Sequence, residues 1–433
     1  MSSLRVLMVN KFHYLKGGSE TYHFAVGEGL AQMGHEVAWF AMEDPLNLPC
    51  DQARFFVSAV DYNGRTSLAK KIRDGVALLY NFEAKRKFEA LCEAFKPDVV
   101  HLNLTHRQLT FSILDAPYLN EHKVPVVYTA HDYIPICPNC TMLDGNGNVC
   151  DACLVGRFDA CVRKHCVKGS RAKSALAAAE ARFLRLHHSY DKVDCFIAPS
   201  KFMAGKLLEG GFDRRRVVYM QNFAKDEVLE CARTAEDLTD RENPFLLFFG
   251  RLSREKGVDV LVEAFLRVVD TIPGWRLIIA GDGPERAAIE EMLSSSSQGG
   301  RVKLVGHLGQ AEIQRYAERA SLAIASSRCR ENMPYSIIEA LAAGTPVVGT
   351  RIGGIPELVL EGETGFVCEP DDVISLAAAL RRGISICVQP TSYLMMQVKC
   401  RSYVLKRCDQ SRYMKELVSL YESLALSRRS RNA

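Results

Sequence analysis

Short, strongly apolar segments recur along the chain, and most are followed by a stretch whose apolar residues are spaced as on one face of a helix. The stretch from 258 to 269, for example, places Val258, Leu261, Phe265 and Val268 on a single face. Apolar runs that alternate with such helices are typical of strands buried in a parallel sheet. The predicted strands cover residues 4–10, 35 onward, 98–103, 124–130, 193–198 and 217–221 in the first half, and 245–249, 277–280, 302–305, 322–325, 346–348 and 365–368 in the second.

This alternation predicts an α/β fold with two Rossmann-like, doubly wound parallel sheets that face a cleft. A chain of 433 residues is too long for one ordinary core, which agrees with two domains. We expect a first domain over residues 1–225, a charged linker without periodicity over 226–243, and a second domain over 244–390. Residues 391–433 are expected to form helices that could return to the first domain, followed by a basic tail without fixed structure.

Composition narrows the class of protein. Hydrophobic residues make up 48% and charged residues 24% of the chain, which is typical of a globular enzyme. The net charge of +4 is too small to indicate nucleic acid as a partner. The sequence shows neither a signal peptide nor an apolar run long enough to span a membrane, so we expect a cytoplasmic protein.

Two basic stretches, 70–73 and 85–87, are expected on the surface of the first domain. Such stretches allow a peripheral contact with anionic lipid at the inner membrane surface. A solvated helix face is the favoured interpretation, because charge runs without an apolar partner face seldom bind membranes.

Glycines and charged residues gather directly after several predicted strands, at the sheet edge where open α/β proteins bind ligands. Gly17 and Gly18 either make a tight turn or let a diphosphate or sugar approach the backbone. His131 follows the strand at 124–130 and is either a structural hydrogen-bonding residue or part of a site. Arg251 and Lys256 share the next such loop, where they are either solvated charges or a grip for an anionic diphosphate.

Two carboxylates, Glu331 and Glu339, lie eight positions apart in the loop and helix after the strand at 322–325. Ser336 and Glu339 match the S-x-x-E pattern of a capping box, which would satisfy backbone N–H groups at a helix start. Glu331 has no such structural explanation. A helix start also concentrates N–H groups and positive dipole, which suits a phosphate. We therefore interpret this stretch as part of a ligand site.

An insertion over about residues 137–170 is rich in cysteine. Two C-x-x-C pairs flank a turn of Asp, Gly and Asn residues, a spacing similar to that of a zinc ribbon. We expect a structural zinc site whose ligands are Cys137, Cys150, Cys153 and Cys166. Alternative ligands are Cys140, Cys161 and His165, and an iron–sulfur cluster or free thiols are the other interpretations.

Four motifs follow one another along the chain: Gly17-Gly18-Ser19-Glu20, Gly250-Arg251 with Glu255-Lys256-Gly257, Gly281-Asp282-Gly283-Pro284, and Glu331 with Glu339. Together they resemble the retaining GT-B glycosyltransferases of family 4, also called glycosyl transferases group 1, over nearly the whole chain. The sequence has no Asp-x-Asp, the metal-binding motif of the other main glycosyltransferase fold. It departs from the family pattern at Asn332 and Pro334, where glycines are usual, and Pro334 has no N–H to donate.

The resemblance implies transfer of a hexose-type sugar from a nucleotide-sugar donor to a glycan or lipid-linked acceptor, as in polysaccharide biosynthesis. It implies a metal-independent, front-side attack without a catalytic cofactor and without nucleic acid as a partner. Arg251 and Lys256 would neutralise the diphosphate, Glu331 would hold the sugar and Glu339 would bind the ribose. His131 would lie beside the sugar and complete the catalytic set with Arg251, Lys256 and Glu331. The other implied donor-binding residues are Gly17, Gly18, His307, Asn332, Met333, Tyr335 and Ser336.

Two other functions fit the same fold. A sugar-nucleotide epimerase would convert the donor itself and need no acceptor. A non-catalytic scaffold is the third hypothesis, and the joint presence of Arg251, Lys256, Glu331 and Glu339 argues against it.

Overall fold

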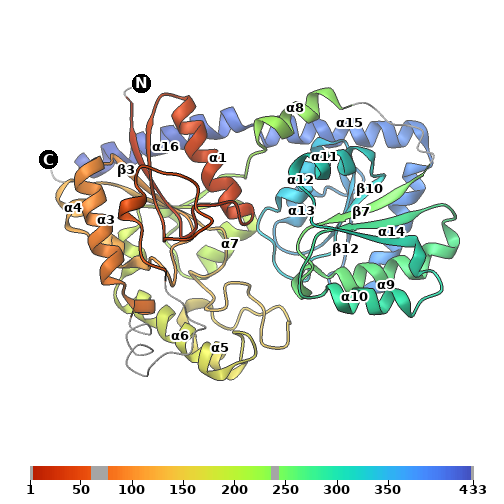
Figure 1. Ribbon diagram of the computed structural model, residues 1–433, viewed down its shortest axis with the longest axis horizontal. Coiled ribbons are helices and arrows are strands. Elements are labelled where there is room, and N and C mark those ends of the chain that lie inside the picture. The colour runs from red at the N-terminus through yellow and green to blue at the C-terminus, as the bar shows by residue number, and fades with distance from the viewer. Residues whose placement is uncertain (1–2, 60–76, 236–242, 431–433) are drawn as a thin grey trace. The chain divides into compact units, whose positions relative to one another are not determined.

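The computed structural model describes residues 3–59, 77–235 and 243–430, which form two compact units (Figure 1). Unit 1 comprises residues 1–220 and 411–433, and unit 2 comprises residues 221–410. Each unit has its own parallel six-stranded sheet and its own apolar core, so the predicted α/β class with two doubly wound sheets is confirmed. The basic stretch 70–73 lies outside the described residues.

The sheet of unit 1 has the strand order β2-β1-β3-β4-β5-β6. The strands β3, β4 and β5 are buried along their whole length, which explains why they read as continuous apolar runs in the sequence. The chain changes direction across the sheet between β1 and β3, so the loops after these strands border the usual ligand crevice of such a sheet. The strands are β1 (Arg5–Val9), β2 (Glu36–Phe40), β3 (Val99–Leu102), β4 (Val126–Thr129), β5 (Cys195–Ala198) and β6 (Val217–Tyr219).

The helices of unit 1 include the last helix of the chain, α16, which is drawn in blue in Figure 1. Two tyrosines of α16 reach buried partners in this unit: Tyr421 lies 2.6 Å from His101 Nδ1, and Tyr413 lies 2.5 Å from the hydroxyl of Tyr22. The helices are α1 (Gly18–Gln32), α3 (Phe82–Phe95), α4 (Pro117–Glu121), α5 (Asp159–Arg163), α6 (Arg171–Leu186), α7 (Lys201–Glu209) and α16 (Gln410–Ser430).

The sheet of unit 2 has the strand order β12-β11-β10-β7-β8-β9. Here the chain changes direction between β7 and β10, so the loops after these two strands flank the switch point. The strands are β7 (Phe245–Phe249), β8 (Arg276–Ala280), β9 (Val302–Gly306), β10 (Leu322–Ala325), β11 (Val347–Thr350) and β12 (Gly365–Cys368).

Helices lie on both faces of this second sheet. Helices α9 (Val258–Val268) and α14 (Val373–Cys387) pack together, and α10 (Arg286–Ser294) packs beside α9. Helices α8 (Asp226–Thr234), α11 (Gln310–Arg319), α12 (Tyr335–Ala342) and α15 (Pro390–Arg407) form another packed group, and α13 (Ile355–Leu358) packs against β11. In Figure 1 these two groups lie on opposite sides of the strands of unit 2.

Two expectations, one for the linker and one for the basic end of the chain, were wrong. Residues 226–234 form helix α8 instead of an irregular linker, because Leu229, Cys231 and Ala232 are buried while acidic residues occupy the first turn. The basic end of the chain is helical to residue 430, and Arg428 donates two hydrogen bonds, of 2.8 and 2.9 Å, to the Asp194 carboxylate.

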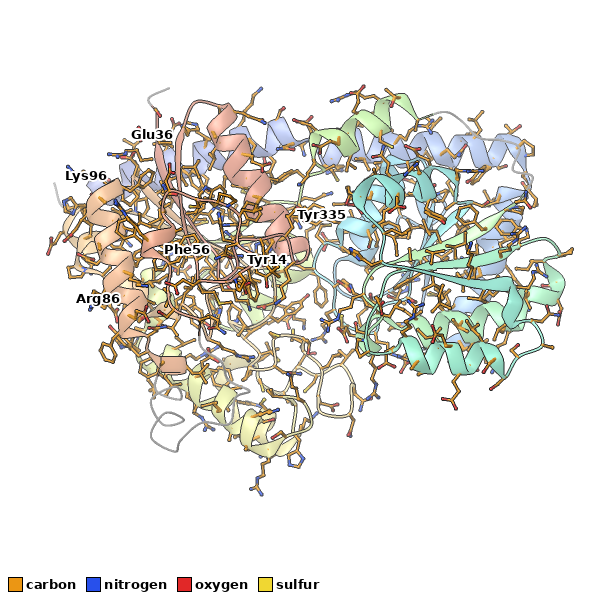
Figure 2. All side chains as sticks on the ribbon, viewed as in Figure 1. Tyr14, Glu36, Phe56, Arg86, Lys96 and Tyr335 are labelled. Carbon is orange, nitrogen blue, oxygen red and sulfur yellow. The ribbon has the colours of Figure 1, made fainter. Side chains whose placement is uncertain are left out.

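The second basic stretch, 85–87, lies on helix α3. Figure 2 shows Arg86 and Lys96 pointing away from the interior, whereas Phe56 points into it. Lys87 is paired with Glu83 at 3.0 Å, so the stretch includes an ion pair on the helix surface. None of the described helices is long and apolar enough to cross a bilayer. Contact with a membrane surface stays a prediction.

Candidate active site

The loop after β7 holds Arg251 and Lys256 and depends on close backbone contacts. Leu252 N–H donates a 2.9 Å hydrogen bond to the carbonyl of Asp282 in the loop after β8. A Cβ atom on Gly281 would lie 1.9 Å from the carbonyl oxygen of Gly250, so only glycine fits there. A short 3-10 helix (Arg254–Lys256) and Gly257, with φ 63°, then turn the chain into α9. These backbone contacts fix the position from which the Lys256 side chain extends.

The loop after β10, residues 326–334, is fastened to the Lys256 loop. Ser326 Oγ donates to the carbonyl of Lys256 at 2.9 Å. Arg328 makes a two-pronged contact with Asp259, with both N–O distances 2.7 Å, and a further contact of 2.6 Å with Asp371. The two loops that flank the switch point of the sheet therefore act as one structure.

Lys256 and Glu331 meet between these loops. Lys256 Nζ donates to Glu331 Oε1 at 2.6 Å, and Ser327 Oγ donates to the same oxygen at 2.8 Å. Burial alone would raise the pKa of Glu331, but the charge and hydrogen bonds of Lys256 and Ser327 outweigh it and lower that pKa. Burial opposes the charged form of Lys256 too, yet Glu331 raises its pKa. Both groups are therefore charged at neutral pH.

The backbone of Glu331 is held by a glycine turn after β11. Gly354 N–H donates to the Glu331 carbonyl at 2.7 Å. Gly353 has φ 59°, and a Cβ atom there would lie 2.2 Å from the same carbonyl oxygen. Nothing in the local sequence around these glycines indicates contact with Glu331.

The predicted capping box at the start of α12 was wrong. Helix α12 begins at Tyr335 after Pro334, so Ser336 lies inside the first turn, and no side chain caps the helix. Glu339 instead accepts a 2.9 Å hydrogen bond from Gln310, the first residue of α11. Burial raises the pKa of Glu339 to about 7. Since Glu339 is not used as a cap, its carboxylate is available for another partner.

The other residues predicted for the donor lie around this start of α12. Asn332 and Tyr335 are partly exposed, whereas Met333 is only 4% exposed and could offer a ligand little more than backbone groups. Arg251 is exposed at the end of β7. His307 is exposed in the loop between β9 and α11, three positions before Gln310.

The remaining predicted site residues belong to unit 1. Gly17 precedes α1 with φ −174°, an extended conformation open to any residue, and a Cβ atom there would find its nearest neighbour, Glu20, 3.8 Å away. The absence of a side chain at Gly17 therefore leaves space beside the first turn of α1, which begins at Gly18. His131 lies directly beyond β4, and burial lowers its pKa to about 3, so its ring is neutral. Its Nε2 lies 2.8 Å from Asn103 Oδ1, a partner that sequence reasoning missed.

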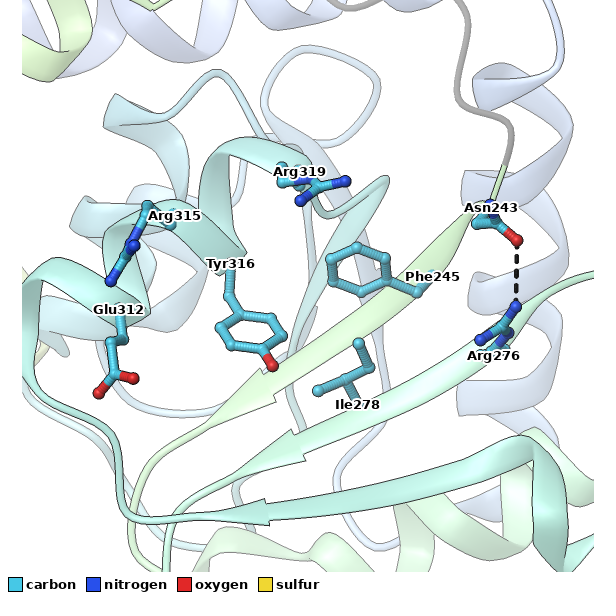
Figure 3. Close-up of a pocket in the computed structure, with 8 residues that line it drawn as sticks. All are labelled: Asn243, Phe245, Arg276, Ile278, Glu312, Arg315, Tyr316 and Arg319. Carbon is cyan, nitrogen blue, oxygen red and sulfur yellow. Dashed lines mark hydrogen bonds between the residues drawn. The ribbon is translucent and has the colours of Figure 1, made fainter.

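A separate cavity of about 460 Å³ lies at the other end of the unit 2 sheet. Figure 3 shows it lined by Phe245 and Arg276, the first residues of β7 and β8, with Asn243 hydrogen-bonded to Arg276 at 3.0 Å. The loops of the candidate site follow the last residues of these strands. This cavity is therefore distinct from the candidate active site.

Solved structures define the class of fold. Alr3699/HepE from Anabaena, solved in complex with UDP-glucose, aligns over 97% of this chain and 100% of its own, with a TM-score of 0.63 and 16% identity. The fold is therefore GT-B, as the sequence resemblance implied.

Family models agree with the fold. The model Glycosyltransferase Family 4 matches residues 16–227, and Glycosyl transferases group 1 matches residues 243–385. The chain belongs to this family of glycosyltransferases, often called family 4.

Two curated relatives illustrate how far the similarity extends. A glycogen synthase of Mycobacterium tuberculosis is 39% identical over 138 residues, which are 31% of this chain and 33% of that protein. An uncharacterised 42.6 kDa protein of the cps region of Klebsiella pneumoniae is 24% identical over 82% of this chain and 87% of its own. The matched stretch spans little more than a third of the first curated relatives.

Proposed function

We propose that this protein is a retaining glycosyltransferase that moves a hexose-type sugar from a nucleotide-sugar donor to a glycan or lipid-linked acceptor. The observation that carries the proposal is the Lys256–Glu331 pair of 2.6 Å at the switch point of unit 2. The family models and the UDP-glucose complex of the Anabaena protein support a nucleotide-sugar donor over other ligands.

The charges of unit 2 suit the diphosphate and the sugar. An ammonium group has three N–H donors, and Lys256 gives one to Glu331, so it keeps others for phosphate oxygens. Every described contact of the Glu331 carboxylate falls on Oε1, so Oε2 can accept a sugar hydroxyl. Arg251, exposed in the same loop as Lys256, adds a second cation for the leaving diphosphate.

Glu339 suits the ribose of the nucleotide. An ionised carboxylate has two oxygens that can accept bonds from neighbouring hydroxyls, and Gln310 occupies Oε1. His307 lies in the loop between β9 and α11, three positions before Gln310. Because Gln310 contacts Glu339, His307 would border the base of the nucleotide. Backbone groups of residues 332–336 would meet phosphate and sugar oxygens, except at Pro334, which has no N–H.

The mechanism follows from where charge develops. The bond between the anomeric carbon and the donor phosphate breaks, and its electron pair leaves with the diphosphate. Arg251 and Lys256 stabilise that charge without a metal, a contribution worth about 3–4 kcal/mol for one well-placed donor. The acceptor hydroxyl forms the new bond on the same face and passes its proton to the leaving phosphate, which retains the anomeric configuration. The neutral His131 would hold a hydroxyl of the sugar.

The test begins with ligand binding. Nucleoside diphosphates and nucleotide sugars are screened for an increase in melting temperature, because a ligand that binds only the folded protein stabilises it, by about 2.7 kcal/mol at one hundred times its Kd. The stabilising donor is then incubated with the protein alone. Formation of an epimer of the donor would support the epimerase alternative and refute the proposal.

Arg251→Ala then tests the assigned role. We expect the rate of transfer to fall about 100- to 1000-fold, because one cation is lost from the transition state. Lys303→Ala is the matched control, since Lys303 is an exposed cation of the same unit. Equal activity of both variants and the wild type would contradict the role of Arg251. The anomeric configuration of the product, measured by NMR, decides between retention and inversion.

A further inference from the structure

The cysteine-rich insertion has a backbone of little regular structure between β4 and α6. A single antiparallel bridge joins Leu143 and Val149, and Cys150 N–H donates to the carbonyl of Met142 at 2.8 Å. The C-x-x-C pair at 137–140 precedes this small hairpin, and the pair at 150–153 follows it. Two such pairs at the ends of a hairpin have the arrangement of a zinc ribbon.

The apolar core of the insertion is too small to hold this segment by itself. Seven buried residues form it: Cys153, Phe158, Ala160, Cys161, Cys166, Ala178 and Ala181. Phe158 is the one large side chain among them, and three members are cysteines. Segments of this size usually depend on a metal ion or on disulfides. All 15 cysteines are free thiols in this structure.

The four predicted ligands come from three separate places in the sequence, and backbone contacts bring these places together. Gly145 N–H, in the turn of the hairpin, donates to the carbonyl of Lys164 at 3.0 Å, so the segment that leads to Cys166 lies against the hairpin that precedes Cys150. Cys153 and Cys166 share one buried cluster, and Cys137 belongs to the same apolar core as Met142 of the hairpin. Cys140 has a different environment, near Asp132 and Arg107. Cys161 lies in the same buried cluster as Cys153 and Cys166, and its carbonyl accepts a 3.1 Å hydrogen bond from Cys166 N–H.

A backbone N–H group points at one of these sulfurs. Ala152 N–H donates to Cys150 Sγ at 3.5 Å, two positions after the first cysteine of its pair. A neutral thiol is a weak acceptor, whereas a metal-bound thiolate is a strong one that is normally supported by such outer hydrogen bonds.

A cation lies beside the cluster. Lys164 Nζ is 3.5 Å from Cys150 Sγ and 3.5 Å from Asp144. Four thiolates around a divalent ion carry a net charge of −2, which a neighbouring ammonium would partly neutralise.

From these contacts we propose that Cys137, Cys150, Cys153 and Cys166 bind one zinc ion that holds the insertion together. Across residues 3–59, 77–235 and 243–430, no three His, Cys, Asp or Glu side chains are already close enough to share a metal. Binding therefore draws the four sulfurs inward to about 2.3 Å from the ion and releases one proton from each thiol. The site also tethers the chain after His131, because Cys137 N–H donates to the carbonyl of Tyr133 at 2.8 Å.

The experiment uses the full chain, purified under reducing conditions without chelator. Elemental analysis should find about one zinc per chain, and titration with a mercurial reagent should release it as four thiols react. The protein refolded with Co²⁺ should show a sulfur-to-cobalt charge-transfer band and the visible bands of tetrahedral cobalt. These measurements on the unaltered protein do not depend on whether any variant folds.

Variants then assign the ligands. Cys150→Ala and Cys153→Ala should each lose the metal and lower the melting temperature of unit 1. Cys140→Ala and the control Cys50→Ala should keep about one zinc per chain. Absence of bound metal, iron with sulfide in its place, a disulfide among the four cysteines or loss of zinc in Cys140→Ala would each overturn the proposal. None of these readouts depends on transfer activity.

Discussion

Replacing Lys256 by methionine removes the cation that Glu331 faces in the ligand-free protein. Lys256 Nζ lies 2.6 Å from Glu331 Oε1, and the two side chains are 29% and 15% exposed. Removing one partner of a fully buried pair costs about 3–5 kcal/mol, and removing a partner from an exposed pair costs at most about 1 kcal/mol. Since this pair is mostly buried, we expect Lys256→Met to lower the free energy of unfolding by about 2–3 kcal/mol.

The loss arises because Glu331 keeps its burial but loses its counter-ion. The carboxylate would then keep only the hydroxyl of Ser327 and the thiol of Cys329 among its described partners, and the pKa of Glu331 would no longer be lowered by Lys256. Unit 2 spans residues 221–410, about 190 residues, for which each kcal/mol corresponds to about 2–4 °C. The expected decrease in its melting temperature is therefore about 4–12 °C.

A double-mutant cycle measures the pair directly. Lys256→Met, Glu331→Gln and the double variant are unfolded by heat and by urea, with Lys303→Met as an exposed control. The double variant leaves no unpaired buried charge, so it should be more stable than the sum of the single losses predicts, by about 2 kcal/mol. Additive losses, or single losses below about 0.5 kcal/mol, would refute the energetic coupling of the two side chains.

The same variants test the proposed function separately from stability. Lys256→Met should reduce the rate of transfer about 100- to 1000-fold at a temperature where the variant is folded. Wild-type turnover in a folded Lys256→Met protein would refute its role at the diphosphate, and the stability cycle would still be valid.

Two further predictions concern other groups. Burial raises the pKa of Glu339 to about 7, so the affinity for a nucleoside diphosphate should rise about tenfold from pH 6 to pH 8 as this carboxyl group ionises. Glu339→Gln should remove that rise. A rise that persists in the variant would contradict the assignment to Glu339. In the ligand-free protein the sign is opposite, because the folded state binds this proton more tightly and the stability contributed by Glu339 falls as pH rises through 7. Tyr421→Phe removes the hydroxyl that lies 2.6 Å from His101 Nδ1 and should cost about 1–3 kcal/mol in unit 1 without changing nucleotide affinity, which calorimetry of the folded variant can check.

Strands were the most predictable part of this chain. The run Phe245 to Phe249 is apolar throughout and bounded by Pro244 and Gly250, so its limits can be read directly from the sequence. Strands such as β4 and β5 are buried on both faces, and burial of this kind leaves a continuous apolar signal. The sequence did not predict the order of the strands within each sheet, whereas the general rule for α/β folds predicted that the loops after the strands would form the ligand site.

Side-chain partners were less predictable, because they depend on residues far apart in the chain. Lys256 and Glu331 could each be proposed from their loops, but their contact joins residues 75 positions apart. The S-x-x-E pattern at Ser336 predicted a local partner, whereas Glu339 bonds to Gln310, 29 positions away. Helix α8 was missed because its charged residues hide a short apolar face that only packing within unit 2 reveals.

The two carboxylates of this site, Glu331 in the loop after β10 and Glu339 on α12, differ in a way that the sequence could not show. Glu331 is held charged by Lys256, and its contacts fall on one oxygen, so the other is set in place before any ligand binds. Glu339 has a pKa of about 7 and is therefore only partly ionised at neutral pH. If each binds hydroxyls of the donor as proposed, binding at Glu331 should be independent of pH near neutrality, and binding at Glu339 should release protons. Calorimetric titrations with a nucleoside diphosphate, in buffers of different ionisation enthalpy, should therefore detect proton release in the wild type and lose it in Glu339→Gln.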